Sequence, residues 1–331
     1  MMSAPAVPTE IHDETDETEP RAYRLVRPLG RGGSSWVWEA EAIGGSRAVV
    51  VKRLDARDHA SGRMYRSELA ALGALRHPHI VELIDYGVAD GALHVVLERV
   101  DGIDLGRALA DGPLAPAMAF ALILDVALAL AHAHAPRPEA PEGIAHRDVR
   151  PDNVLVGCDG HARLSDFGLA RGALGREATQ SDAVRGTPGF VAPESVRGAP
   201  AGSPVDVWAL GAMLHTLVVG RAPVRSFEHA HAIAHGAPLE LDPALWRDPA
   251  LGPARDLVER CLVRAPEARP SAAEVAERAR EALGAQSRGA RTALAAWVRA
   301  IGARERGALD DLFFSTVVPG GSSTLVLERP T

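Results

Sequence analysis

The pattern of apolar and polar residues divides the chain into two unlike parts. In the first part, short runs of alternating apolar residues predict strands at 23–28, 36–43 and 47–54, which would form an antiparallel meander. Residues 60–76 have the apolar spacing of a helix, and two further strand-like runs follow and end at Val100. This part is therefore predicted to be a sheet with one helix.

The second part changes to long segments rich in alanine and leucine, which predict helices from Asp101 to about residue 283. The predicted fold class is α+β and bilobal. Residues 23–100 would form a small antiparallel β lobe with one helix, and residues 101–283 a larger, mostly helical lobe. The two lobes would join near residues 98–102.

The two ends of the chain differ from the part between them. Residues 1–22 are rich in proline, threonine and acidic side chains and are predicted to be disordered. Within residues 284–331, an i, i+3, i+4, i+7 stripe predicts an amphipathic helix. The stripe consists of Leu294, Trp297, Val298 and Ile301. Such a helix docks on the large lobe, which we favour, or binds a partner or an anionic surface. The tail after Phe314 is expected to be flexible.

Composition and charge exclude several classes of function. The net charge of −7 disfavours non-specific binding of nucleic acid. The two cysteines, Cys158 and Cys261, form no disulfide or metal-binding pattern, and residues 1–20 do not resemble a signal peptide, so we expect a cytoplasmic protein. The apolar stretch 118–135 is about as long as a membrane span, but Asp125 and two histidines interrupt it. A buried helix, and no membrane span, is the better interpretation.

Lysine usage singles out one position. Lys52 is the one lysine among 36 basic residues, so its position can require a compact ammonium of the kind that binds polyphosphate, although chance is the alternative. Alternation along the predicted strand places Lys52 on the same face as Ala48 and Val50. Glu68 lies on the apolar stripe of the following helix and is a natural partner for Lys52, unless it sits at the edge of the stripe and reaches water.

A glycine-rich turn, GRGGSSWV at Gly30–Val37, lies between the first two predicted strands. The exposed backbone amides of such a turn can close over phosphates. Taken alone, an ordinary hairpin turn without a ligand is the simpler interpretation.

Three motifs in the second part carry the specific signal. They are HRDVRPDN at His146–Asn153, DFG at Asp166–Gly168 and APE at Ala192–Glu194. Together with the glycine-rich turn, Lys52 and Glu68, they occur in the order found in protein kinases. Residues 23–283 thus resemble the protein kinase family, and in particular its bacterial eukaryotic-like Ser/Thr kinases.

The resemblance implies transfer of a phosphoryl group from ATP with the help of Mg²⁺. Asp148 would take the proton of the attacking hydroxyl, and Asn153 and Asp166 would hold Mg²⁺ through hard oxygen atoms. Lys52 would bind the α- and β-phosphates and would be held in place by Glu68.

The resemblance also implies a nucleotide pocket between the lobes. Adenine would bind to the backbone at the hinge, with Leu97 behind it, and one apolar side chain from each lobe would enclose the ring. The residues predicted to bind the nucleotide are Leu29, Gly30, Gly32, Gly33, Val37, Val50, Lys52, Glu98, Val100 and Leu155.

The predicted substrate is a protein. Residues 186–194 resemble the substrate-docking loop of Ser/Thr kinases, in which Thr187 would contact Asp148, so a serine or threonine of a protein is the expected acceptor. Thr179 and Ser181 occupy the place of an autophosphorylated pair, which makes the chain its own predicted substrate.

Three further assignments come from the resemblance. Arg147 would bind the phosphate added by autophosphorylation, the buried Asp206 would brace the catalytic loop, and Arg269 would pair with Glu194.

Three positions depart from the family pattern, namely Ser35, Val50 and Arg150. Arg150 stands where the family has a lysine that contacts the transferring phosphate, and we interpret it as a tolerated exchange. The main alternative to a kinase is a pseudokinase scaffold that acts through protein interaction. The docking loop disfavours a second alternative, a kinase for a small metabolite.

Overall fold

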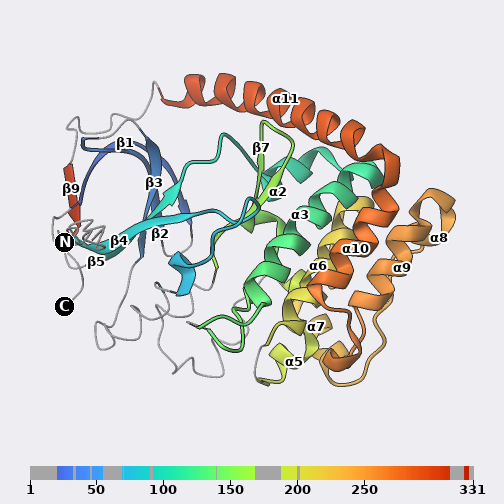
Figure 1. The fold of residues 1–331 in the computed structure, drawn as a ribbon. Helices are drawn as coiled ribbons and strands as arrows, with labels where there is room; N and C mark the ends of the chain where they lie inside the picture. The colour runs from blue at the N-terminus through green and yellow to red at the C-terminus, as the bar shows by residue number, and fades with distance from the viewer. Residues whose placement is uncertain are drawn as a thin grey trace, which may run out of the picture.

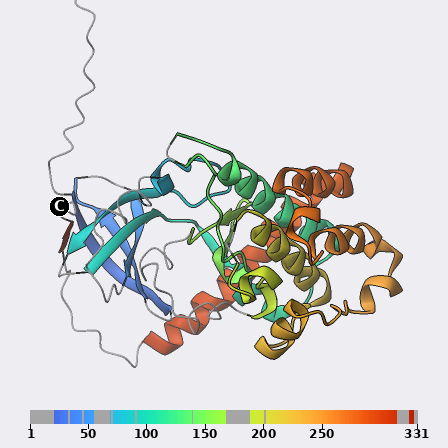
Figure 2. The same ribbon diagram turned by 90° about the horizontal axis from the view of Figure 1, so that it is seen from below.

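The computed structural model describes most of the chain as a small sheet-containing lobe beside a larger helical lobe (Figures 1 and 2). The described residues are 21–32, 35–44, 47–54, 69, 71–89, 92–138, 140–167, 188–199, 202–313 and 324–327. The predicted α+β architecture is confirmed. Most of the predicted helix at 60–76 lies outside the described residues.

The small lobe is a six-stranded antiparallel sheet with the strand order β4-β5-β3-β2-β1-β9. Its strands are β1 (Arg21–Gly32), β2 (Ser35–Ala42), β3 (Ala48–Leu54), β4 (Leu83–Ala89), β5 (Ala92–Glu98) and β9 (Thr324–Leu327). The three N-terminal strands lie where the alternating pattern predicts them, because each places one row of apolar side chains, such as Val49 and Val51, in the core of the lobe.

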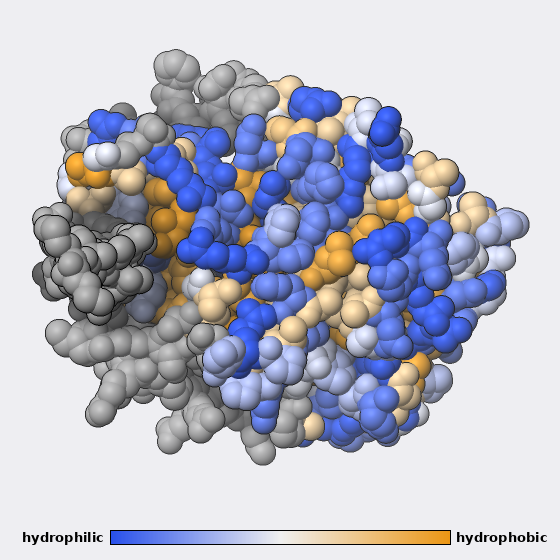
Figure 3. Space-filling view, in the orientation of Figure 1, coloured by the Kyte–Doolittle hydropathy of each residue, from blue (hydrophilic) through white to orange (hydrophobic). Residues whose placement is uncertain are grey.

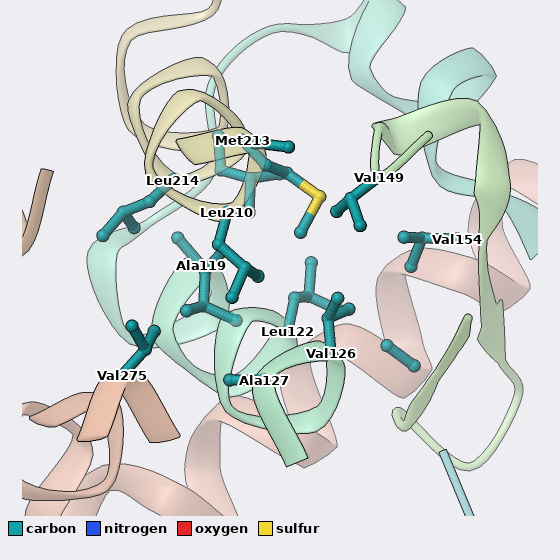
Figure 4. Close-up of a cluster of buried hydrophobic side chains, with 14 of the residues drawn as sticks. Ala119, Leu122, Val126, Ala127, Val149, Val154, Leu210, Met213, Leu214 and Val275 are labelled. Atoms are coloured by element: carbon teal, nitrogen blue, oxygen red, sulfur yellow. The ribbon is translucent and has the colours of Figure 1, made fainter. Parts of the chain in front are cut away.

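The large lobe is built around α3 (Pro116–His134), against which α6 (Pro204–Val219) and α10 (Ala272–Leu283) pack. Figure 4 shows Leu122 and Val126 of α3 facing Leu210 and Met213 of α6. Because neighbours surround α3, it is apolar on nearly all sides. It is also the one helix among the described residues that is long and apolar enough to cross a membrane, and 67% of its most apolar stretch is buried in the lobe.

The long C-terminal helix and several short elements complete the large lobe. The helices are α2 (Leu105–Ala108), α5 (Pro193–Val196), α7 (Phe227–Ala234), α8 (Ala244–Arg247), α9 (Gly252–Cys261) and α11 (Ser287–Phe313). A second sheet consists of β6 (Gly102–Asp104), β7 (Val154–Gly157) and β8 (Ala162–Leu164) in that order. Polar side chains cover most of the face seen in Figure 3, and apolar ones show between them in small patches.

Local sequence signals explain where the long helices begin and end. α6 begins at Pro204, whose fixed φ suits the first helical turn, and ends before Gly220, which has the left-handed φ of 85°. α10 begins with a capping box, in which Ser271 and Glu274 bind each other's backbone amides.

The C-terminal region contacts both lobes. α11 packs on α3, β6 and β7, and its predicted stripe is buried or half-buried, so docking on the large lobe is confirmed. The prediction of a flexible tail is wrong for Thr324–Leu327, which form β9 and pair antiparallel with β1. Leu325 and Leu327 explain the difference, because they bury their side chains in the core of the small lobe.

Candidate active site

The segment between α3 and β7 brings Asp148 and Asn153 together. A single turn of 3₁₀ helix at Pro151–Asn153 folds the chain back on itself. As a result, the Asn153 Nδ2 donates to the Asp148 carbonyl at 2.7 Å and to the Asp148 Oδ2 at 2.9 Å. The carboxylate of Asp148 is half exposed, with 50% of its side chain accessible. Asn153 therefore holds the Oδ2 of Asp148, and the other carboxylate oxygen is available to a reactant.

Asp206 of α6 fixes the backbone just before Asp148. It is fully buried and accepts hydrogen bonds from the backbone amides of His146 at 2.8 Å and Arg147 at 2.7 Å. The ring of His134, at the end of α3, lies 2.8 Å from the same carboxylate. Arg147 has a φ of 68°, a conformation that is costly for a residue other than glycine and persists because Asp206 secures it. The predicted bracing role of Asp206 is confirmed.

His146 connects the Asp148 segment to the Asp166 segment. Its Nδ1 accepts from the Asp148 amide at 3.2 Å, which leaves the ring proton on Nε2 to donate to the Ser165 carbonyl at 2.8 Å. Its ring also packs edge-to-face with that of Phe167, with 4.5 Å between ring centroids. This role of His146 was not among the roles predicted from the sequence, although its place in the same motif as Asp148 was a usable signal.

Lys52 and Asp166 meet across the two lobes. The Lys52 Nζ on β3 lies 2.8 Å from the Asp166 Oδ2, and both side chains are largely shielded from water. Asp166 has a φ of 62°, so it shares with Arg147 the only non-glycine positive φ values among the described residues. The predicted partner of Lys52, Glu68, lies outside the described residues, and the pair that the structure contains is Lys52–Asp166.

The backbone next to Asp166 is hydrogen-bonded to Asn153. The Ser165 amide and hydroxyl both donate to the Asn153 carbonyl, at 2.9 and 3.1 Å, which fixes Asp166 next in the chain. Because the Nδ2 of Asn153 is used by Asp148, its Oδ1 remains as an acceptor. One amide oxygen and one carboxylate are hard donors, and this donor set fits a divalent cation.

Backbone pairing places the predicted nucleotide-binding residues of the central strands beside one another. Val37 on β2 lies opposite Lys52 on β3, and Val50 lies opposite Leu97 on β5. The Glu98 amide donates to the Glu82 carbonyl at 2.9 Å, which secures the end of β5 before the hinge.

The remaining nucleotide-binding predictions divide between the lobes. Gly30 and Gly32 end β1, and Leu29 beside them is 38% exposed. On the large lobe, Leu155 lies on β7 opposite Asp104. Val100 follows β5 and is half-buried at the start of the connection to the large lobe.

Arg150 lies beside the carboxylates of this segment. Its guanidinium is 3.7 Å from Asp148 and 3.6 Å from Asp152. A cation is thus available at the position where the sequence analysis expects one. Four further predicted residues, Gly33, Thr179, Ser181 and Thr187, lie outside the described residues.

The pair predicted between Arg269 and Glu194 is confirmed. Two guanidinium nitrogens of Arg269 donate to the two carboxylate oxygens of Glu194, at 2.6 and 2.8 Å, and both side chains are buried. The pair fixes α5, whose first residues are the last residues of the predicted docking loop.

Comparison with known proteins agrees with this geometry. Residues 23–279 match the protein kinase domain family. The chain is 36% identical over 278 residues to the serine/threonine-protein kinase PkaA of Streptomyces coelicolor, a match that covers 77% of this chain and 48% of the relative. It is 36% identical over 209 residues to PknD of Mycobacterium tuberculosis, covering 62% of this chain and 30% of the relative.

A third bacterial relative is the serine/threonine-protein kinase pkn2 of Myxococcus xanthus. It is 32% identical over 268 residues, which is 76% of this chain and 31% of the relative. The chain therefore spans about half or less of the length of these curated relatives.

Proposed function

The chain belongs to the protein kinase family, and from this premise we propose that it transfers the γ-phosphoryl group of ATP to a serine or threonine hydroxyl of a protein. One observation carries the proposal. Separate segments bring Lys52 within 2.8 Å of Asp166, and Asn153 within 2.9 Å of Asp148. Phosphoryl transfer depends mainly on positioning and charge neutralisation, which is what such a group of side chains supplies.

Each of these residues has its own task. Asp148 accepts the proton of the attacking hydroxyl, and the hydrogen bond from Asn153 keeps its carboxylate oriented for this. Lys52, which lies 2.8 Å from Asp166, would bind the phosphates of ATP, and Arg150 would place a second cation near the transferring group.

We propose that the metal is Mg²⁺ and that Asn153 and Asp166 would hold it. When bound, Mg²⁺ neutralises the negative charge of the phosphates. The protein contributes the two oxygen donors, and the hydrogen bonds from Ser165 to the Asn153 carbonyl tie the two segments that carry them together. The rate of transfer with Mg²⁺, Mn²⁺ and Ca²⁺ in turn identifies the preferred ion.

The direct test follows labelled γ-phosphate from ATP to the protein itself and to a generic basic protein acceptor. We expect label with the wild type and a loss of at least about 100-fold in both Asp148→Asn and Lys52→Met. Circular dichroism controls for the fold of each variant. If the folded wild type transfers no label with any divalent metal, the proposal fails and the scaffold alternative replaces it.

The same reaction tests self-phosphorylation. We propose Thr179 and Ser181 as the sites, with Arg147 as the residue that binds the new phosphate, because Arg147 precedes Asp148 directly. Mass spectrometry of active protein should find at least one of the two phosphorylated. Active protein with both residues unmodified would contradict this assignment.

We further propose that the protein acts in the cytoplasm. Both cysteines are free thiols, and burial raises the pKa of Cys261 to about 12, which makes this thiol unreactive. Cell fractionation with an antibody against the chain tests the location, and recovery in the membrane fraction would contradict it.

A further inference from the structure

The C-terminal helix α11 carries an arginine into the interior of the large lobe. The Nη1 and Nη2 of Arg291 each lie 2.5 Å from a different oxygen of Asp125, at the middle of α3. Asp125 is 1% exposed and Arg291 is 15% exposed, so this is a buried bidentate ion pair. Arg291 lies beyond residue 279, where the match to the kinase family ends.

The surroundings of Asp125 resemble a metal site, but the cation there is the arginine. The His79 Nε2 lies 3.4 Å from one Asp125 oxygen, and the His161 Nδ1 lies 3.6 Å from the other. Two histidines and a carboxylate can hold a metal ion. Because the guanidinium already contacts both carboxylate oxygens, a metal ion would have to displace it.

Asp125 and Arg291 together hold the turn between β7 and β8. The Ala162 amide of β8 donates to Asp125 at 2.8 Å, and Arg291 donates to the Gly160 carbonyl at 3.2 Å. Gly160 has a φ of 80°, and a Cβ added there would lie 2.3 Å from the Arg291 carbonyl oxygen. The backbone of α11 therefore rests directly on this turn, which requires glycine at residue 160.

β8 transmits this contact to the active site. The Leu164 amide donates to the His79 carbonyl, and the Val81 amide donates to the Leu164 carbonyl, both at 2.9 Å. Leu164 is also the last residue of β8, two positions before Asp166. Because only Ser165 separates β8 from Asp166, a shift of β8 would move the Asp166 carboxylate.

We propose that Arg291 is a positioning residue for phosphoryl transfer. Through Asp125 and the β7–β8 turn it fixes the place of Asp166, so the catalytic unit extends beyond residue 279 to include α11. The inference rests on the proposed function, because it assigns Arg291 a part in the placement of the metal-binding carboxylate.

The test replaces Arg291 by methionine, which keeps the length of the side chain and removes its charge. Arg304→Met is the matched control, because Arg304 lies on the same helix and pairs with Asp111 at the surface, where the two side chains are 61% and 47% exposed. Calorimetry measures binding of ADP as a function of Mg²⁺ concentration, and a kinase assay measures the KM for Mg²⁺ and kcat. We expect Arg291→Met to raise two quantities by about 10-fold or more: the Mg²⁺ concentration needed for half-maximal ADP binding, and the KM for Mg²⁺. Arg304→Met should change neither by more than about 2-fold.

Two further variants separate positioning from stability. Asp125→Asn combined with Arg291→Met removes the unpaired buried charge, and Arg291→Lys keeps the charge but not the fork. Both variants should fold and still need a higher Mg²⁺ concentration than the wild type. If Arg291 only stabilised the fold, folded variants would need the same Mg²⁺ concentration as the wild type. A wild-type Mg²⁺ dependence in these folded variants would overturn the inference. A wild type that binds ADP with Mg²⁺ yet transfers no phosphate would instead count against the proposed function.

Discussion

Within its described residues the large lobe contains two buried pairs of an arginine with a carboxylate, and they differ in where the arginine comes from. Arg269 binds Glu194 through two bonds of 2.6 and 2.8 Å, and Arg291 binds Asp125 through two bonds of 2.5 Å. The first pair lies within the part of the chain that matches the kinase family. The second joins that part to a helix outside it.

The comparison shows how the same chemistry can serve two purposes. Arg269 also donates to the carbonyls of Val263 and Pro204, each at 2.8 Å, and lies 5.1 Å from the centroid of the Trp208 ring. All of these partners belong to the large lobe itself, so Arg269 links segments that the lobe already surrounds. Arg291 attaches an additional helix. Because desolvation offsets much of the Coulomb attraction in buried pairs, both act mainly by specifying where their segments lie.

Removing Arg269 should have the largest effect. Arg269→Met leaves the buried Glu194 charge and three carbonyls without this partner, so we expect a loss of about 3–5 kcal/mol in the free energy of unfolding. Denaturation with urea measures it. Arg255→Met, at a surface pair with Asp256, should change stability by less than about 0.5 kcal/mol. An Arg269→Met protein as stable as the control would show that Glu194 finds another partner.

Removing Arg291 should cost less. Arg291 keeps 15% of its side-chain exposure, so water can reach Asp125 when the guanidinium is gone, and we expect Arg291→Met to lose about 2–3 kcal/mol. Adding Asp125→Asn should restore part of that loss, because the amide carries no charge. A double variant less stable than Arg291→Met would contradict the view that the unpaired charge causes the loss.

The second attachment of the C-terminal region, β9, is apolar and sharpens the contrast. Leu325 is 8% exposed in the core of the small lobe, whereas Val326 next to it is 46% exposed. We expect Leu325→Asn to lose about 1–2 kcal/mol and to increase amide exchange in β1, and Val326→Asn to do neither. Equal effects of the two substitutions would mean that the backbone pairing alone holds β9.

Acid should slightly lower the free energy of unfolding through His77, which lies near Asp125. Burial and the neighbouring His79 and His132 lower the pKa of His77 from 6.5 to about 4. Between these pH values His77 binds a proton in the unfolded chain but not in the folded chain. The free energy of unfolding is therefore not reduced by His77 above pH 6.5 and falls as the pH is lowered toward 4. Since His77 is partly exposed, we expect less than about 1 kcal/mol between pH 6.5 and 5. His77→Gln should flatten this slope, and an unchanged slope would assign it to other groups.

The contrast between the two pairs also marks what the sequence could predict. The motifs around Asp148 and Asp166 have fixed spacing and chemistry, so their residues and the Arg269–Glu194 pair could be identified from the sequence. The amphipathic stripe of α11 predicted docking. It could not indicate that Arg291 meets Asp125, because that contact joins residues 166 positions apart.

Two other features were out of reach for different reasons. Lys52 pairs with Asp166 across the lobes, a contact set by how the lobes meet rather than by local periodicity. β9 is four residues long, too short for alternation to distinguish it from a tail, and it forms because β1 offers a sheet edge.

Asp125 also has a consequence for the chain during its synthesis. About 150 residues separate α3 from α11, so at roughly 5–20 residues per second α3 leaves the ribosome on the order of 10 s before Arg291 exists. During that time a free apolar helix could enter a membrane. A carboxylate at the centre of such a helix opposes insertion by about 2.5–3.5 kcal/mol. We therefore expect Asp125→Leu to increase insertion of a ribosome-bound α3 into vesicles, so that one side chain protects the nascent helix first and anchors α11 later.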